Sequence, residues 1–394
     1  MVRSKGGQMV TRREFLRKTA LAGAGLIAGR ALFAWDRQRD PLKETSLDKA
    51  WELHRKCLII DGHNDVVLTR IVVGKENPVL KWTEQDTTYQ TDIPRARANG
   101  QQYVAFLIMS AGTGSFPNCV RNITITDQSI RDNPSVLMKV LTSADAVAAG
   151  ASGKVGCIYA IEGSYGPLSG NLDNLRTLYE KGVRLAGITH KEGGSEPNYL
   201  QGTRSESKLM TESERADYLK NSVGLTPFGI EALKEMNKLG VIVDLSHSND
   251  RTVYDVLEKS SHPPVVSHTV ASALCPTARG LTDDQIKKIG QKGGVMGMTF
   301  VPGFIGRTKA EQTMDRYIDH IVHVADLAGI DSVGIGSDYD GAVGYPLLTG
   351  DVSNLVSVTQ GLLNRGFTEP EIRKIWGGNF LRVMKQVIDK PAAG

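Results

Sequence analysis

Eight short apolar segments rich in β-branched residues recur along this chain, and longer segments with helical periodicity separate them. The apolar segments cover residues 57–65, 103–110, 155–163, 182–190, 240–248, 263–269, 293–300 and 332–340. Continuous apolar strands that alternate with helices are typical of a buried parallel sheet. Because there are eight of them, we predict an α/β fold, a (β/α)8 TIM-type barrel, rather than an open doubly wound sheet.

The connections between these strands carry helix signals and three long insertions. At Thr226-Pro227, a capping residue and a first-turn proline open a helix that Gly240 ends. A second helix is predicted over 282–292, with two aspartates in its first turn. Three connections are longer than such folds need, and we expect them to form lids or rims at the C-terminal face of the barrel. They are residues 66–100, 111–150 and 191–225.

The start of the chain has the features of an export signal. The motif TRREFLR begins at Thr11, and an uncharged stretch rich in Ala, Gly and Leu follows at 19–29. This pattern resembles a bacterial twin-arginine signal. The uncharged stretch has 11 residues, against the roughly 20 needed to span a bilayer. We therefore predict a cleaved signal peptide over 1–34 and a single barrel domain over 35–394.

Such a leader predicts where the protein goes. The expected partner is the twin-arginine export machinery, and the expected location is periplasmic or extracellular, in soluble form and without a stable membrane anchor. Twin-arginine passengers are exported folded, which suits a protein that receives a metal inside the cell. The alternative is an amphipathic N-terminal helix of a cytosolic protein.

Charge in the rest of the chain is nearly balanced. Residues 1–34 hold seven of the 47 basic and one of the 43 acidic side chains, which leaves 40 basic and 42 acidic side chains in 35–394. This balance gives no electrostatic basis for binding nucleic acid or an anionic membrane. The four cysteines form no CxxC pair, so neither a zinc finger nor a thioredoxin-like site is expected.

Side chains suited to metal binding or acid–base chemistry stand at the ends of six predicted strands. In a (β/α)8 barrel, catalytic groups lie at the C-terminal ends of the strands, whatever the reaction. Four of the eight histidines fall at such ends, although these positions are a small fraction of the sequence. The residues are His63, Asp65, Glu162, His190, His247, His268 and Asp338.

Each of these residues alone has a simpler explanation. His63 and Asp65 are two apart in an extended segment, so both side chains can face one ion, and an imidazole with a carboxylate suits Zn²⁺. They could equally be a turn histidine and an aspartate that caps a helix. Glu162 could form a salt bridge with a loop arginine, and His247 or His268 could be hydrogen-bonded in the core. The combination of all of them favours a metal site.

Glu162, His247 and His268 form a second potential set of ligands. A carboxylate that lies between two ions can bridge them, so we predict two Zn²⁺ per chain, bridged by Glu162 and by a hydroxide or water. Two metals that share a hydroxide provide a nucleophile at neutral pH and polarise a scissile carbonyl. The ligand charges leave such a site net positive, which favours an anionic substrate.

Motifs in a characteristic order run through the chain, within a match that covers residues 57–388. They are DGHNDVV at 61–67, TDIPR at 91–95, IEG at 161–163, GVR at 182–184, ITH at 188–190, GLTPFG at 224–229, LGVIVDLSHS at 239–248, VVSHT at 265–269 and GSDYDG at 336–341. Together they resemble the membrane dipeptidase (renal dipeptidase) family of zinc peptidases. The resemblance implies a (β/α)8 barrel with a binuclear zinc site.

The resemblance also implies how the metal ligands are shared. His63 and Asp65 would bind one zinc ion, and His247 and His268 would bind the other. Glu162 would bridge the two ions.

Three further residues would contact the substrate. The resemblance implies that His190 stabilises the carbonyl oxygen and that Arg279 binds the terminal carboxylate, for which its planar fork is suited. Asp338 would hold the free amino group and transfer the proton as general acid and base. Alternatively, Arg279 is a surface residue at a helix start, Asp338 is a helix cap remote from the metals, and Asp340 competes for the proton-transfer role.

The implied activity is zinc-dependent hydrolysis of dipeptides, with a D-residue commonly tolerated at the second position. The chain departs from the animal relatives at 191–197, where KEGGSEP replaces an Asn-Thr-Pro-Trp-like loop. Side-chain specificity therefore stays open, although hydrolysis does not depend on this loop. The inter-subunit features of the animal relatives do not transfer, and a homodimer is compatible with the sequence.

Two other functions fit parts of the sequence. Another binuclear barrel hydrolase, acting on amides or lactones, usually has His-x-His on its first strand and a lysine that bridges the metals. This chain has His63 and Asp65 on the first strand and Glu162 on the third, which argues against that alternative. A non-catalytic binding protein on the same scaffold would have lost a ligand, and none is lost.

Overall fold

The computed structural model describes residues 2–3, 9–10, 45–72, 78–112, 114–190, 200–202, 208–341 and 347–391. The chain divides into two compact units, Met1–Gln38 and Arg39–Gly394. In the first unit the structure describes the antiparallel pair β1 (Val2–Arg3) and β2 (Met9–Val10). The twin-arginine motif and the uncharged stretch of the predicted leader lie outside the described residues. No helix among the described residues is long and apolar enough to cross a membrane.

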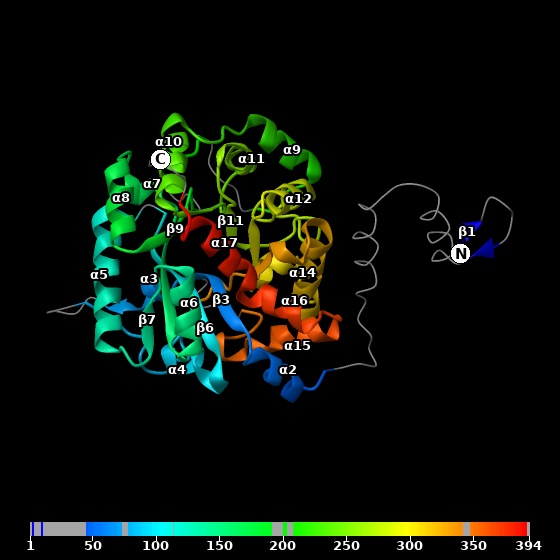
Figure 1. The fold of residues 1–394 in the computed structure, drawn as a ribbon. Coiled ribbons are helices and arrows are strands. Elements are labelled where there is room, and N and C mark those ends of the chain that lie inside the picture. The colour runs from blue at the N-terminus through cyan, green and yellow to red at the C-terminus, as the bar shows by residue number, and fades with distance from the viewer. Residues whose placement is uncertain are drawn as a thin grey trace. The chain divides into compact units, whose positions relative to one another are not determined.

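Eight parallel strands form a closed barrel in the second unit (Figure 1). The strands are β3 (Leu58–Asn64), β6 (Gln102–Ala111), β8 (Val155–Glu162), β9 (Val183–Gly187), β10 (Ile242–Asp244), β11 (Val265–Thr269), β12 (Val295–Met298) and β13 (Val333–Ile335). β6 pairs with both β3 and β8, and the ring closes where β13 pairs with β3. Each strand overlaps one predicted apolar segment, so the prediction of a (β/α)8 TIM-type barrel is confirmed.

Helices cover the outside of this barrel. They are α2 (Leu47–His54), α3 (Val66–Arg70), α4 (Ile93–Ala96), α5 (Phe116–Asp132), α6 (Ser143–Ala151), α7 (Tyr165–Leu168), α8 (Leu172–Glu180), α9 (Glu212–Asn221), α10 (Pro227–Leu239), α11 (Asp250–Lys259), α12 (Asp283–Gln291), α13 (Pro302–Ile305), α14 (Met314–Ala328), α15 (Val356–Asn364), α16 (Glu369–Arg373) and α17 (Asn379–Val387). Short helical turns follow α4 (Ala98–Gly100), precede β13 (Ile330–Ser332) and α15 (Val352–Asn354), and join α16 to α17 (Lys374–Gly378).

The helix ends agree with the signals in the sequence. Thr226 caps α10 by accepting a hydrogen bond from the Gly229 amide at 2.9 Å, and Gly240 ends the helix with a φ of 76°. Thr282 caps α12, and the Thr282 amide donates a hydrogen bond to Oε1 of Gln285 at 2.9 Å. These bonds satisfy backbone groups that a helix leaves unpaired at its ends. Both predicted helices are therefore confirmed.

The long connections do not all form rims. Residues 66–100 contain α3, the antiparallel pair β4 (Ile71–Val72) and β5 (Val79–Leu80), and α4. Residues 111–150 contain α5, β7 (Leu137–Lys139) and α6, and these elements pack on β6 and β8 as part of the barrel wall. In the connection 191–225, the described residues contain one helix, α9.

One end of the barrel is closed by α17. Figure 1 shows this helix crossing the middle of the ring of strands. Phe380, Val383 and Val387 join interior strand residues in a buried apolar cluster. Asn379 donates from Nδ2 to the carbonyl of Val333, the first residue of β13, at 2.7 Å, so the helix lies at the amino ends of the strands. The polar strand ends therefore gather at the opposite, C-terminal face.

Candidate metal centre

Five of the predicted strand-end side chains converge at the C-terminal face. His63 lies near the end of β3, Asp65 follows that strand, and Glu162 ends β8. His268 lies in β11, and His247 follows β10. Four of the five residues are at most 5% exposed, and the side chain of His247 is 12% exposed. Residues far apart in sequence are thus placed together in a largely buried site.

Glu162 lies in the middle of this cluster. Its Oε1 atom is 2.9 Å from Nε2 of His247, 3.5 Å from Nε2 of His268 and 3.6 Å from Nε2 of His63. Its Oε2 atom is 3.6 Å from Nε2 of His190. The alternative of a salt bridge to a loop arginine is not found among the described residues. A carboxylate surrounded by four imidazoles is the expected position for a bridging ligand.

Asp65 faces the same point as His63. By its backbone it occupies the residue before α3, but its side chain makes no capping hydrogen bond to the helix. Its Oδ2 atom instead lies 3.1 Å from Nε2 of His63. The structure therefore excludes the helix-cap explanation for this aspartate.

Three overlapping groups of side chains are compact enough to hold cations. Within each group the potential ligand atoms lie within 4.8 Å of one another. The groups are His63, Glu162 and His268; Glu162, His190 and His247; and His63, Asp65 and Asp338. Nε2 of His268 also lies 3.1 Å from Nε2 of His247 and 3.5 Å from Oε1 of Glu162, so His268 is close enough to share an ion with either histidine. Shared ligands make the cluster suitable for two neighbouring ions, and its imidazole and carboxylate donors suit zinc.

The pKa shifts within the cluster reflect how closely its carboxylates are packed. Burial raises the pKa of Glu162 to about 8; His63 opposes this shift, whereas Asp65 and Asp338 add to it. Burial lowers the pKa of His63, but Asp65 and Glu162 outweigh this effect and raise it to about 10. Protons are therefore retained where carboxylates crowd together. A divalent cation would take the place of these protons.

Two buried histidines elsewhere show how a structural histidine is held in this protein. His54 forms hydrogen bonds with a threonine hydroxyl at 2.8 Å and a glutamine carbonyl at 3.0 Å. His320 forms hydrogen bonds with a backbone amide and a backbone carbonyl, each at 3.0 Å. Both rings thus have neutral partners on two sides. The Nε2 atoms of His247 and His268 instead face each other and Glu162, as expected for metal ligands.

A serine–aspartate pair orients two of the site histidines. The Ser267 hydroxyl donates to Oδ2 of Asp244 at 2.6 Å. Its oxygen lies 3.0 Å from Nδ1 of His268 and 3.4 Å from Nδ1 of His63. Since a hydroxyl has one hydrogen, the oxygen is the acceptor toward both rings, and each Nδ1 carries the proton. Both rings then turn the nitrogen that can bind metal toward the centre of the cluster.

The sequence did not single out Asp244 or Ser267 as site residues. The available signal was a carboxylate within the apolar segment around Asp244, because a buried carboxylate is costly without partners. Three glycines make room for this arrangement. A Cβ on Gly62, Gly297 or Gly336 would collide with the carbonyl oxygen of Ser267. The absence of these side chains lets the strands approach closely.

His190 lies at the edge of the cluster. Its side chain is 29% exposed, and its ring centroid is 4.6 Å from that of His247. Gly112 and Gly163 have positive φ values of 56° and 82°, and a Cβ on either would lie 2.9 Å from an atom of His190. These glycines allow the imidazole to stand beside Glu162. A partly exposed ring therefore stands beside the buried cluster.

The structure distinguishes between the two candidate aspartates. Asp338 and Asp340 have φ values of 62° and 64°, a left-handed conformation that is rare outside glycine and often found at functional sites. Asp338 joins His63 and Asp65, and burial raises its pKa to about 6. Asp340 accepts a hydrogen bond from the Gln90 amide at 2.7 Å. Asp338 is therefore the aspartate that faces the cluster, and it does not cap a helix.

Arg279 is a buried residue, 7% exposed, and not a surface arginine. Its Nη2 donates to the carbonyl of His268 at 3.3 Å, and its Nε has no hydrogen-bond partner among the described residues. Burial lowers the pKa of Arg279, while Asp338 and Glu162 act in the opposite direction. The guanidinium therefore keeps donor capacity beside the cluster, where an anionic ligand could use it.

Residues 47–392 match the family model for membrane dipeptidases, peptidase family M19. The chain belongs to this family. The resemblance identified from the motifs is thereby confirmed, and membership makes the protein a metallo-dipeptidase. The residues at the strand ends fit the metal that the family name implies, because their donors are nitrogen and oxygen atoms turned toward common points.

Relatives of this membrane dipeptidase family member have been found by sequence and by structure. The dipeptidase tcpJ of Claviceps purpurea (strain 20.1) is 28% identical over 346 residues, which are 84% of this chain and 78% of the relative. The solved dipeptidase AC, a metallopeptidase of family M19, is 25% identical with a TM-score of 0.71, covering 84% of this chain and 99% of that one. A Rhodobacter sphaeroides metallopeptidase liganded with a phosphinate mimic of L-Ala-D-Ala is 23% identical with a TM-score of 0.69, with the same coverage of 84% and 99%.

Proposed function

We propose that this metallo-dipeptidase hydrolyses dipeptides with two divalent metal ions, and that these ions are zinc, bound at the cluster around Glu162. The observation that carries the proposal is the position of Glu162, whose two oxygens face four imidazole nitrogens at 2.9–3.6 Å. His63 and Asp65 would hold one ion and His247 the other. His268, which lies beside both His63 and His247, would complete the second set.

Metal ions bound there would supply Lewis-acid chemistry, lowering the pKa of water and polarising the scissile carbonyl. Hydrolysis then adds the oxygen of water to the carbonyl carbon, breaks the C–N bond and delivers a proton to the departing nitrogen. Asp338, with its pKa raised to about 6, is suited to accept the proton from water and pass it to that nitrogen. His190, at the exposed edge, would donate a hydrogen bond to the developing oxyanion.

Arg279 would limit the substrate to two residues. Its guanidinium is placed to bind the C-terminal carboxylate, and Asp338 would also hold the N-terminal ammonium group. An anion-binding group at one end and a cation-binding group at the other leave no space for a longer peptide. A D-residue at the second position is part of the proposal, and the L-Ala-D-Ala mimic bound to a solved relative of the same fold makes that dipeptide a useful probe.

We also propose that the protein is exported. The motif TRREFLR at Thr11 supports a signal peptide over 1–34, a catalytic domain over 35–394 and export by the twin-arginine machinery to the periplasm or the extracellular space. A homodimer remains compatible with this arrangement.

Metal analysis combined with a substrate panel tests the function. We expect about two equivalents of zinc per chain, cleavage of L,L and L,D dipeptides such as L-Ala-D-Ala, and no cleavage of matched tripeptides. Removal of metal by a chelator should abolish cleavage, and added Zn²⁺ should restore it. Cleavage of tripeptides at a similar rate, or of cyclic amides or lactones instead of dipeptides, would contradict the proposal.

A further inference from the structure

Arg215 forms a second buried polar cluster beside the site. It lies in α9, within the long connection that precedes β10, and it is 9% exposed. Its Nε and Nη2 atoms donate to the two carboxylate oxygens of Asp250, at 2.9 and 2.7 Å. Asp250 is the first residue of α11 and follows His247 by three positions. The ion pair therefore joins α9 to the segment that carries a potential metal ligand.

The other N–H groups of Arg215 bind the loop that carries Arg279. Nη1 donates to the Ser272 hydroxyl and to the Thr277 carbonyl, each at 3.0 Å, and Nη2 donates to the Gly280 carbonyl at 2.8 Å. Thr277 and Gly280 lie on either side of Arg279 in the sequence. A guanidinium has five N–H groups, and all five are used here.

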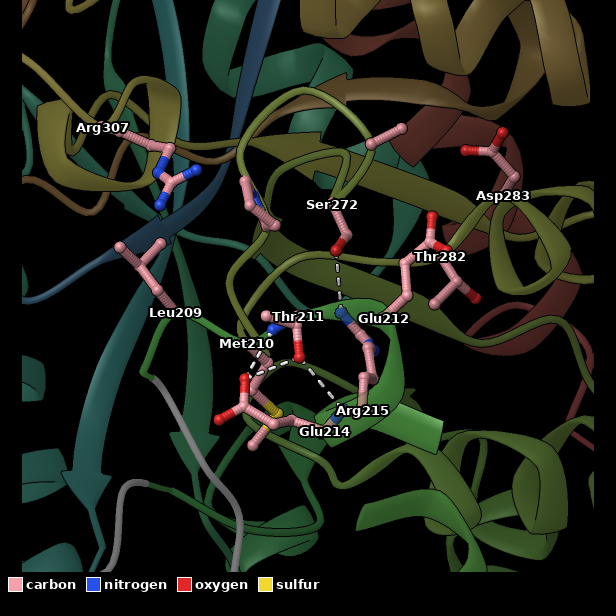
Figure 2. Close-up of a pocket in the computed structure, with 12 residues that line it drawn as sticks. Leu209, Met210, Thr211, Glu212, Glu214, Arg215, Ser272, Thr282, Asp283 and Arg307 are labelled. Carbon is pink, nitrogen blue, oxygen red and sulfur yellow. Dashed lines mark hydrogen bonds between the residues drawn. The ribbon is translucent and has the colours of Figure 1, made fainter. Parts of the chain in front are cut away.

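A cavity of about 670 Å³ lies next to this contact (Figure 2). Its lining includes Met210 and Thr211 at the start of α9 on one side and Ser272 and Pro276 of the loop on the other. Figure 2 shows the side chain of Arg215 reaching from α9 to Ser272 across this space. The residues before α9 add two backbone hydrogen bonds, from Met210 to Pro276 and from Ala278 to Lys208, at 2.9 and 3.0 Å.

The side chain of Arg279 is held more weakly than that of Arg215. Its Nη2 donates to the His268 carbonyl at 3.3 Å, its guanidinium lies 5.9 Å from the centroid of the Phe304 ring, and its Nε has no hydrogen-bond partner among the described residues. The position of its guanidinium therefore depends on the backbone around it. Arg215 contributes to fixing that backbone through its bonds to the carbonyls of Thr277 and Gly280, and the Thr269 hydroxyl donates to the Arg279 carbonyl itself at 3.2 Å.

We propose that Arg215 is a positioning residue that holds the Arg279 loop so that Arg279 can bind the substrate carboxylate. The proposal rests on the proposed function of Arg279. It makes α9, in the connection between β9 and β10, part of the substrate-binding machinery, although α9 supplies no metal ligand. A lysine cannot replace the arginine, because three N–H groups on one nitrogen cannot reach five acceptors that surround a planar fork.

Three graded variants test the proposal through the split between KM and kcat. For a dipeptide with a free C-terminal carboxylate, Arg215→Met should raise KM by roughly 10- to 100-fold, the range expected when a binding group shifts by about 1 Å. Arg215→Lys should have an intermediate effect, and Ser272→Ala, which removes one hydrogen bond, the smallest. In all three, kcat should change by less than about 3-fold and the metal content should stay as in the parent enzyme. For the matched C-terminal amide, KM should hardly change.

A double-mutant cycle with Arg279→Ala shows whether Arg215 acts through Arg279. If it does, Arg215→Met should add little to the KM of the Arg279→Ala enzyme. Arg176→Lys provides the control, because Arg176 is 46% exposed and forms ion pairs with Asp173 and Glu235 on the outer surface. The control should leave both constants unchanged.

The outcomes separate this inference from the function on which it rests. If Arg279→Ala affects the free acid and the amide equally, the carboxylate-binding role of Arg279 is wrong, and the inference falls with it. If Arg279→Ala discriminates between the two substrates but Arg215→Met does not, only the inference is wrong. A fall in kcat on both substrates with KM unchanged, or additive effects in the cycle, would show a merely structural role and overturn it as well.

Discussion

Two buried polar clusters lie side by side at the C-terminal face, and they differ in how their charges are compensated. The Arg215 cluster pairs a guanidinium with the carboxylate of Asp250 through two hydrogen bonds, and Gln285 donates a third to that carboxylate at 2.8 Å. The Glu162 cluster places three carboxylates among histidines whose nitrogens point at one another. The first cluster is complete within the chain, whereas the second needs an external cation.

This difference in charge compensation distinguishes a structural site from a functional one. A buried carboxylate is tolerated when a fixed positive partner and enough donors surround it, as Asp250 shows. Glu162 forms ion pairs with histidines but with no arginine or lysine in the described part of the chain, and burial and the neighbouring carboxylates raise its pKa to about 8.

Substitution of Glu162→Gln should have the largest effect, because it removes the one carboxylate that faces both groups of ligands. We expect metal affinity to fall by more than the roughly 10- to 100-fold that loss of an outer partner causes, and turnover to fall to the level of the metal-free protein. Metal analysis after dialysis and dipeptide assays measure both. Glu52→Gln is the matched control, since Glu52 is exposed and pairs with Lys56. Retention of two metal ions by the Glu162 variant would show that this residue is not a bridge.

Asp338→Asn should come next. The amide keeps the shape of the side chain but cannot accept a proton, so kcat should fall by roughly 10²- to 10⁴-fold, the usual contribution of a general acid–base group. Metal content should remain near that of the parent enzyme, because Asp338 is not among the proposed ligands. Asp340→Asn serves as the comparison, and we expect a smaller loss of kcat from it. Equal losses in the two variants would contradict the assignment of proton transfer to Asp338.

Asp244→Asn should have an intermediate effect that appears in metal binding. The Ser267 hydroxyl would lose its acceptor and could turn toward the rings of His63 and His268, so neither tautomer would be fixed. Metal affinity should fall by roughly 10- to 100-fold, measured by competition with a chromogenic chelator. Asp145→Asn, on the surface helix α6, is the control. An unchanged affinity would show that the serine–aspartate pair does not orient the ligands.

The smallest effect is a pH dependence of stability in the metal-free protein. The folded state keeps a proton on Glu162 up to a pKa of about 8, against an ordinary value of 4.5, and on His63 up to about 10, against 6.5. Both groups bind more protons in the folded than in the unfolded state between pH 6.5 and 8. Stability should therefore fall as pH rises through this window, by about 1.4 kcal/mol per pH unit for each retained proton.

Thermal unfolding with and without metal measures this dependence. A change of 1 kcal/mol corresponds to about 2–4 °C in Tm for a domain of about 150–250 residues, and to a smaller shift for this larger domain. Saturation with Zn²⁺ should raise Tm and flatten its pH dependence over the same window, because the cation replaces the protons. A metal-free protein whose Tm rises from pH 6.5 to 8 would show that the cluster is not short of positive charge.

The sequence already indicated most of the metal cluster, and the reason is geometric. In a parallel barrel every strand delivers its last residues to the same face, so position along a strand is enough to place His63, Glu162 and His268 together. The same rule does not apply to loops. Arg215 and Ser267 were not identified. Arg215 acts from an insertion between two strands, and Ser267 acts through its hydroxyl on the neighbouring histidine rings. Neither type of contact follows from a strand pattern.

By itself, the sequence determined the barrel, the family and the polar strand ends, because apolar periodicity and residue type fix which face each strand presents. Only the tertiary structure decided that Asp65 turns away from its helix, that Asp338 rather than Asp340 faces the cluster, and that Arg215 holds the loop of Arg279. Each of these outcomes depends on which of several possible partners a side chain contacts, and those partners lie several residues or several elements apart. These contacts depend on distances of a few ångström between side chains. Tertiary packing sets those distances, and a local sequence pattern contains no information about them.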